Sequence, residues 1–212
     1  MTLMNIPSRN DTIARLTAIR DFQRTCREQM IEGLDYGPPF PGADKPALLK
    51  PGAEKLLKLF EPPLVPDYKI IEKVEIWETG LFSYTIECNL HIIGTSVKVD
   101  MGLGECNSWE SKYRYRDAKR ACPVCGQATI IKGKQGYGGG WLCWQKLGGC
   151  GAKWADAAQE IVEQKLGKVL NEDLADVKNT VLKMAKKRAL VDAALSASRL
   201  SDFFTQDTGD DE

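Results

Sequence analysis

The chain has 212 residues, of which 43% are hydrophobic and 27% charged, with 29 basic and 29 acidic residues. This length allows one domain with an insertion or two small domains, and the hydrophobic content excludes an intrinsically disordered chain. Because no long apolar run and no N-terminal leader is present, the protein is expected to be cytoplasmic, with its seven cysteines reduced and no attachment to a membrane.

Residues 1–66 are expected to be mainly helical. Between Asp11 and Glu32, apolar residues recur at three- and four-residue steps, which predicts an amphipathic helix; they are Ile13, Leu16, Ile19, Phe22, Cys26 and Met30. After a loop rich in proline and glycine, a second helix is predicted from Lys50, with a proline in its first turn. It is open whether the first helix packs on its own core or on a neighbouring subunit.

An antiparallel β-meander is predicted next. Residues 81–93 alternate clearly between an apolar face that begins at Phe82 and a polar face that begins at Ser83. Weaker alternation over residues 70–77 predicts a strand before them. Val97, Val99 and Met101 continue the pattern after a short turn at Gly94 and Thr95.

Aromatic and basic residues alternate from Lys112 to Arg116, with Tyr113, Arg114 and Tyr115 between them. If the segment is extended, the aromatic rings face one side and the cations the other, a combination suited to bases and phosphates. An ordinary strand with both tyrosines packed inward accounts equally well for the pattern.

Four cysteines in two pairs predict a tetrahedral metal site. Cys122 and Cys125 form a C-x2-C-G knuckle, and Cys143 and Cys150 form a wider C-x6-C pair. The spacing resembles the zinc ribbons at the ends of bacterial type I topoisomerases. The expected ion is Zn²⁺ in a structural role, because four thiolates leave no open position for water.

Positive charge is unevenly distributed. Residues 111–153 contain nine basic residues against Asp117 alone, and a second basic block runs from Lys178 to Arg199. Acidic residues collect elsewhere, including the tail residues Asp207, Asp210, Asp211 and Glu212. Such segregation favours a polyanionic partner.

The C-terminal third is expected to be helical, with one stretch from Trp154 to about Leu170 and a long helix from Glu172 to about Ser198. Its apolar stripe runs from Val177 to Leu195 and includes Arg188, a position that invites a buried carboxylate or a phosphate. Lys183, Lys186 and Lys187 lie on a neighbouring face.

Taken together, these elements predict an α+β fold in which an antiparallel meander packs on a long helix. The expected divisions are an N-terminal helical region (1–66), a β-β-β-α core (67–118 and 155–205), an inserted zinc ribbon with four cysteine ligands (119–154) and an acidic tail (206–212).

This order of elements resembles the single-strand annealing proteins of the Rad-fifty-two type, with the phage RecT and Redβ proteins as relatives. The resemblance rests on the three strands, on a Gly102-Leu103-Gly104 loop with Ser108 or Ser111 downstream, and on the lysine-rich helix from Val177 to Leu195. It covers roughly residues 68–118 and 172–205; the cysteine insertion and residues 1–66 are not part of the family pattern. In that family the core assembles side by side into rings or filaments, and a groove holds single-stranded DNA.

The resemblance implies a phage- or plasmid-like protein, in a cell's cytoplasm or at the nucleoid, that anneals complementary strands in recombination and repair without ATP or a catalytic residue. Implied partners are single-stranded DNA, further copies of the chain, and a single-strand-binding or replication protein. The expected groove residues are Lys112, Tyr113, Arg114, Tyr115, Arg116, Lys183, Lys186, Lys187 and Arg188.

Two alternatives are open. Asp100 with the Glu110-x-Lys112 pattern would suit a metal-dependent nuclease, because carboxylates beside a lysine can hold Mg²⁺ next to a phosphate. A zinc-ribbon adaptor that binds another replication or transcription protein, with the acidic tail as a docking peptide, is the third interpretation.

Overall fold

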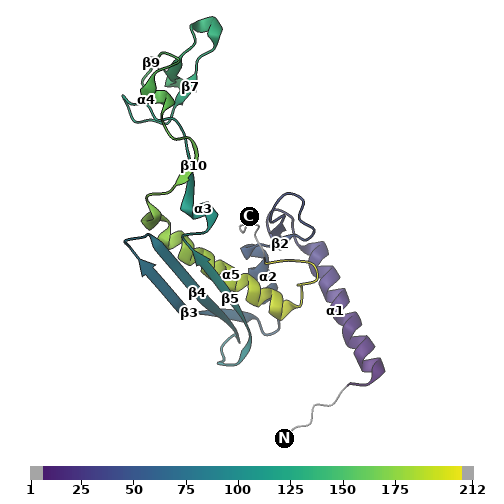
Figure 1. Ribbon diagram of the computed structural model, residues 1–212. Coiled ribbons are helices and arrows are strands. Elements are labelled where there is room, and N and C mark those ends of the chain that lie inside the picture. The colour runs from purple at the N-terminus through teal and green to yellow at the C-terminus, as the bar shows by residue number, and fades with distance from the viewer. Residues whose placement is uncertain (1–6, 207–212) are drawn as a thin grey trace. The chain divides into compact units, whose positions relative to one another are not determined.

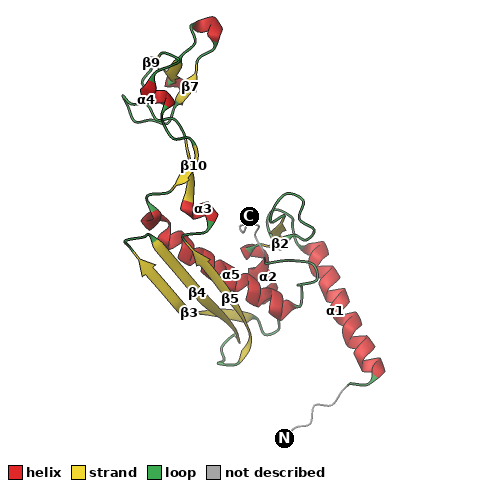
Figure 2. Ribbon diagram, in the orientation of Figure 1, coloured by secondary structure: helices red, strands yellow, loops and turns green. Residues whose placement is uncertain are grey.

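The computed structural model describes residues 7–206 and divides the chain into two compact units. The larger unit comprises residues 1–110 and 175–212, and the smaller unit, residues 111–174, is inserted into it. Figures 1 and 2 show the elements of both. The expected insertion was narrower, residues 119–154. The flanking residues join it because β6 (Tyr115–Ala118) pairs with β10 (Gly167–Leu170).

The fold class is α+β, as predicted from the sequence. In the larger unit, strands β3 (Leu64–Ile76), β4 (Leu81–Ile92) and β5 (Lys98–Asn107) form an antiparallel sheet in the order β3-β4-β5. The long helix α5 (Lys178–Ser198) packs against one face of this sheet (Figure 1). We call this the inner face and the opposite one the outer face.

Strand β4 supplies much of the core, and its predicted alternation is confirmed. The side chains that point to the inner face are at most 3% exposed, namely Phe82, Tyr84, Ile86, Cys88 and Leu90. Burial of each large apolar side chain contributes about 1.5–3 kcal/mol. The alternation therefore sets which face of the sheet α5 covers.

Two glycines let α5 approach β5 closely. A Cβ atom at Gly102 would lie 2.2 Å from the backbone nitrogen of Ala193, and one at Gly104 would lie 2.2 Å from that of Ala189. The expected Gly-x-Gly loop is therefore wrong. These glycines lie within strand β5, and the backbone of α5 occupies the space that their side chains would otherwise fill. The alternation predicted for Val97, Val99 and Met101, with Lys98 and Asp100 opposite, is wrong: a bulge at Val99 interrupts the strand, and Lys98 lies on the outer face with Met101.

A polar network closes one end of the sheet. The Tyr84 hydroxyl donates to the Glu75 carboxylate at 2.6 Å, and Lys178 at the start of α5 forms an ion pair with it at 3.1 Å. The hydroxyl bond, together with this lysine and Lys73, lowers the pKa of Glu75 to about 2. The first turn of α5 is thereby tied to β3.

The N-terminal region consists of α1 (Arg9–Gln29), a short β1–β2 pair (Tyr36–Gly37 and Ala47–Leu48) and α2 (Lys50–Lys58). Both predicted helices are confirmed, and Ser8 caps the first of them by accepting a hydrogen bond from the Asp11 backbone N–H at 3.2 Å. The apolar stripe of α1 lies mostly outside the core of its own unit, because only Gln23 and Cys26 of this helix are buried.

The smaller unit differs most from expectation. It contains α3 (Ser111–Arg114), β6, a three-stranded sheet of β7 (Ile130–Lys132), β8 (Trp141–Cys143) and β9 (Lys153–Trp154), then α4 (Gln159–Val162) and β10. The predicted helix from Trp154 to Leu170 reduces to α4. The long helix α5 begins six residues later than predicted, after a 3-10 turn at Leu174–Val177.

Neither of the 21-residue helices, α1 and α5, nor any shorter helix within residues 7–206 has the length and apolar character needed to cross a membrane. The acidic tail from Asp207 to Glu212 lies outside the described residues.

Candidate metal centre and basic surfaces

The smaller unit brings the four predicted cysteine ligands together. The sulfur atoms of Cys122 and Cys150 lie 3.6 Å apart, those of Cys125 and Cys143 lie 3.7 Å apart, and all four fall within 4.8 Å of one another. In a tetrahedral site with metal–sulfur bonds of about 2.3 Å, neighbouring sulfurs lie about 3.8 Å apart. The four thiols therefore fit around one metal ion. Cys26, Cys88 and Cys106 are buried thiols elsewhere, as expected.

Two backbone knuckles position the ligands. In the first, the Gly126 N–H donates to the Cys122 carbonyl at 2.8 Å; in the second, the Gly151 N–H donates to the Cys143 carbonyl at 3.0 Å. Both glycines have positive φ, +74° and +85°, which side chains disfavour. The wider C-x6-C spacing of the second pair is taken up by the 3-10 turn Gln145–Leu147.

Hydrogen bonds to sulfur favour the thiolate at Cys143. The Thr129 hydroxyl lies 3.1 Å from its Sγ and the Cys150 backbone N–H donates to it at 3.3 Å. These contacts, the hydroxyl foremost, lower the pKa of Cys143 to about 6. The ligand spacing alone did not point to Thr129, which lies on the turn before β7.

Charge divides between the two units. Residues 111–174 contain eleven basic and six acidic residues, a net charge of +5, so the remainder of this neutral chain carries −5. The first predicted basic block thus lies within the smaller unit, whereas the second, from Lys178 to Arg199, lies in the larger unit. A polyanion would be attracted to the smaller unit and repelled by much of the larger one.

The predicted aromatic and basic segment is not one extended strand. Lys112 and Tyr113 lie in the helical turn α3, and Tyr113 is only 8% exposed, whereas Tyr115 and Arg116 lie in β6. The Lys112 ammonium lies 5.1 Å from the Tyr113 ring centre. The two tyrosines therefore do not form a common stacking surface.

Cations also cover two further rings of this unit. The Arg120 guanidinium and the Lys132 ammonium lie 4.1 Å and 4.3 Å from the Trp141 ring, and Lys168 lies 5.0 Å from the Tyr115 ring. Arg120 and Lys132 were not among the predicted nucleic-acid contacts. Their separation from Trp141 in the sequence does not indicate that they contact its ring. The arrangement holds positive groups in place on aromatic rings, which suits binding of phosphates better than stacking of bases.

The predicted lysines of α5 lie toward the N-terminal half of the helix. Lys183 and Lys186 are exposed and Lys187 is partly exposed. Lys186 lies 4.1 Å from the centre of the Tyr68 ring on β3. These lysines form a basic stretch within an otherwise acidic unit.

Arg188 binds a carboxylate of its own unit. Its guanidinium donates to both oxygens of Glu110, at 2.7 and 3.0 Å, and to the Glu105 carbonyl at 2.6 Å. Burial alone would raise the pKa of Glu110, but the hydrogen bonds and charge of Arg188 outweigh it and hold this pKa below its usual range. Of the two roles proposed from the sequence, the carboxylate contact is the one observed.

Replacing Arg188 with alanine is expected to destabilise the larger unit by roughly 1.5–3 kcal/mol, because Glu110 loses two charge-assisted hydrogen bonds while its side chain remains 12% exposed. Urea unfolding followed by circular dichroism measures the change. Lys183→Ala, at an exposed position of the same helix, is the control and should stay within about 0.5 kcal/mol of the parent. Equal stability of the two variants, with oligonucleotide binding abolished only in Arg188→Ala, would assign this arginine to the ligand instead.

The residues of the nuclease alternative are not gathered at one point. About 23 Å of strand separates Asp100 from Asn107, which lies beside Glu110. Asp100 accepts a hydrogen bond from the Ser196 hydroxyl at 3.0 Å, while Lys112 belongs to the other unit. A Mg²⁺ ion holds its ligands at about 2.1 Å, so these two carboxylates cannot share one.

Comparisons of the chain with protein-family models, with curated proteins and with solved structures gave no match. A functional proposal for this chain therefore comes from its residues and their geometry.

Proposed function

We propose that the protein binds single-stranded DNA and anneals complementary strands without ATP, as an oligomer. The observation that carries the proposal is the opposite net charge of the two units, +5 against −5, with the positive charge gathered around a cysteine cluster. The antiparallel β3-β4-β5 meander followed by the lysine-bearing α5 supports it, because this is the element order of the annealing proteins that the sequence resembles.

The ion proposed for the cluster is Zn²⁺. Four thiolates at tetrahedral spacing are the donor set of structural zinc sites, and they leave no coordination position for water or substrate. Its role is to hold the two knuckles together so that the basic residues around them keep their positions.

Annealing requires no chemical step from this chain. Lysine and arginine side chains neutralise the phosphates, which lets two strands of like charge approach each other. Because the rings of Tyr115 and Trp141 are in contact with cations, the grip on the strand is mainly electrostatic. The bases then remain free to test a complementary strand.

Binding is expected to weaken steeply with salt and to depend on both basic surfaces. Lys112→Gln with Arg114→Gln probes the smaller unit, and Lys183→Gln with Lys187→Gln probes α5. Each double variant should lower the affinity for a labelled oligonucleotide. It should also reduce the slope of log K against log salt by about 0.7 for each phosphate that the variant no longer neutralises.

The control is Lys58→Gln with Lys98→Gln, which removes the same charge from exposed positions outside both surfaces. Fluorescence anisotropy measures binding, and annealing of complementary oligonucleotides without ATP measures activity. A zinc-loaded protein that ignores oligonucleotides at low ionic strength would refute the proposal, as would an equal drop in binding for the control.

One observation favours the adaptor interpretation as a second candidate. Val124 and Leu147, each in or beside a cysteine knuckle, are 70% and 60% exposed. Apolar side chains at such positions suit a protein partner. Val124→Ser with Leu147→Ser should leave oligonucleotide binding intact if these residues contact only protein.

A further inference from the structure

Helix α1 carries an apolar stripe that its own unit leaves exposed. Ile13, Leu16, Ile19 and Phe22 follow one another at three-residue steps, and their exposed fractions are 53%, 49%, 41% and 38%. Four large apolar side chains along one helix are more than the scattered exposure that is normal on a protein surface. The stripe therefore calls for a covering surface.

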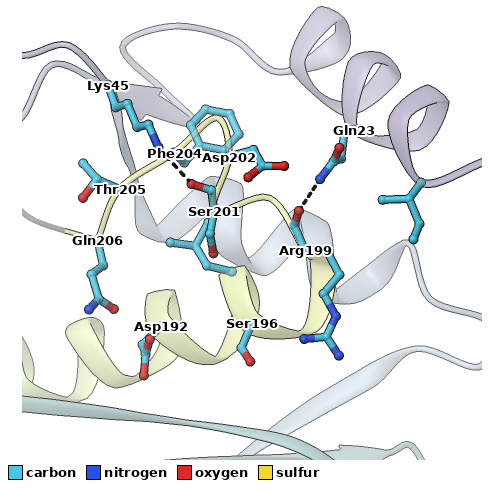
Figure 3. A pocket seen from close by; sticks show the side chains of 12 residues that line it. Gln23, Lys45, Asp192, Ser196, Arg199, Ser201, Asp202, Phe204, Thr205 and Gln206 are labelled. Carbon is cyan, nitrogen blue, oxygen red and sulfur yellow. Dashed lines mark hydrogen bonds between the residues drawn. The ribbon is translucent and has the colours of Figure 1, made fainter. Parts of the chain in front are cut away.

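Only the C-terminal half of α1 is fixed. Gln23 and Cys26 are buried, the Gln23 amide donates to the Arg199 carbonyl just after α5 (Figure 3), and the Arg27 guanidinium lies 5.4 Å from the Phe203 ring. Beside these contacts is a hollow of about 800 Å³, lined by Ile19 and Gln23 of α1 and by the last turns of α5. From Arg9 to Phe22 the helix is exposed along its length.

The outer face of the β3-β4-β5 sheet is a second uncovered surface. Helix α5 packs on the inner face, and the outer side chains are exposed or partly exposed. Apolar residues here include Val65, Ile76 and Leu103, which are 37%, 40% and 50% exposed. An open sheet face of this kind normally carries only polar side chains.

The outer face is acidic as well as apolar. Its strand register places Glu72, Thr85 and Glu105 in one row and Lys69, Glu87 and Leu103 in the next, with Asp67 beyond them. Four carboxylates against Lys69 and Lys98, the latter paired with His91 and in contact with Met101, give this face a net charge of −2. That sign disfavours DNA, so the surface needs an occupant of another kind.

Helix α1 has the opposite sign. It carries five arginines and three acidic residues, a net charge of +2. Its exposed part, from Arg9 to Phe22, has three arginines and two aspartates, a net charge of +1. It is about 21 Å long, which fits on strands of ten to thirteen residues, about 33 Å or more each. Basic and apolar side chains on the helix thus match acidic and apolar side chains on the sheet.

We propose that α1 of one copy docks across the outer face of the β3-β4-β5 sheet of a second copy. Its own sheet is not available to it, because Gln23 anchors α1 at the end of α5, and α5 covers the inner face. Each copy offers one helix and one sheet face, so the contact is head-to-tail and builds a ring or a filament. The proposal deepens the oligomer part of the proposed function and does not depend on DNA binding.

The test uses the full chain carrying Leu16→Glu. Leu59→Glu is the matched control, because Leu59 is 59% exposed and belongs neither to the α1 stripe nor to the outer sheet face. Multi-angle light scattering and sedimentation measure the assembly over a range of concentrations. Leu16→Glu should weaken self-association at least about tenfold, which is about 1.4 kcal/mol, and Leu59→Glu should not. Thermal unfolding confirms that both variants fold.

A charge exchange makes the test specific. Arg15→Glu with Arg20→Glu should give monomers, as should Glu72→Lys with Glu105→Lys. Mixing the two variants should restore an assembly of alternating copies, because the reversed helix matches the reversed sheet and the unchanged helix matches the unchanged sheet. A monomeric parent protein overturns the proposal. An assembly that Leu16→Glu leaves unchanged also overturns it, even if that variant loses binding to oligonucleotides or vesicles. Annealing assayed separately on these variants reports on the proposed function, whichever way the assembly result falls.

Discussion

Replacing Cys143 with serine is expected to unfold the region from Cys122 to Trp154 and to leave the larger unit folded. Strands β7, β8 and β9 have three, three and two residues, too few to bury a core of their own. A metal ion bound by the four cysteines would therefore supply most of the folding free energy, which is about 10–16 kcal/mol for structural zinc in small peptides. Cys143 is the fully buried ligand. Its sulfur forms a hydrogen bond with the Thr129 hydroxyl and accepts one from the Cys150 backbone N–H.

Three measurements check this expectation: metal content, near-ultraviolet circular dichroism from the tryptophans of the smaller unit, and limited proteolysis between residues 111 and 174. Removing the metal with a chelator should reproduce the effect of the substitution. Cys26→Ala is the control, because it removes a buried thiol of the larger unit and should keep the full metal content. A ribbon that resists proteolysis without metal would show that its hydrogen bonds suffice.

The central strand could be predicted because one physical cause dominates it. From Phe82 to Leu90, every second side chain is apolar and enters the core, and the polar side chains between them face outward. The cysteine ligands could be predicted for a similar reason, since metal geometry constrains spacing more strongly than helix or strand propensity does. In both cases the signal lies within a short segment of chain.

Pairing between distant segments left no such signal. Strand β10 pairs with β6 across about fifty residues, with Gly167 opposite Ala118, and each strand has only four residues. This pairing and the short helix α4 replace the long helix expected there. Tertiary context decides such segments, because propensity differences of a few tenths of a kcal/mol are easily outweighed.

The sequence could predict that basic residues gather in one region, but it could not predict which groups they contact. The sequence shows that cations collect between residues 111 and 153, yet the partner of each cation depends on the fold. Arg188 was expected at a carboxylate or a phosphate and contacts Glu110, and Lys132 lies on the Trp141 ring. The number of charged residues in a segment follows from the sequence, whereas the positions and partners of the charged groups depend on the folded structure.

The exposed stripe of α1 illustrates the same limit at the level of assembly. Its three- and four-residue periodicity correctly predicts a helix with one apolar face, since periodicity reports that a face is to be covered. It does not report whether the covering surface belongs to the same copy. In the larger unit that face is open from Ile13 to Phe22, which is why a second copy is the proposed partner.

Replacing Gly104 with alanine is expected to destabilise the larger unit by roughly 3 kcal/mol or more, at the upper end of the cost of overpacking. The added Cβ would lie 2.2 Å from the Ala189 nitrogen and 2.4 Å from the Ala185 carbonyl oxygen. Both atoms belong to helix backbone, so no side-chain rotation relieves the contact. The sheet and α5 must move apart, which opens the core that Phe82 and Leu90 fill.

Gly37→Ala is the matched control, because its Cβ would meet its nearest neighbour, a flexible Leu49 side chain, at 3.9 Å. This substitution should change the stability by no more than about 1 kcal/mol, since alanine also restricts the unfolded chain. Urea unfolding of both variants gives the comparison. Equal stability would mean that α5 does not lie directly on β5, and it would remove the structural reason for glycine at positions 102 and 104. A large loss of stability at Gly104 alone would show that these glycines serve the packing of helix on sheet, independently of any ligand.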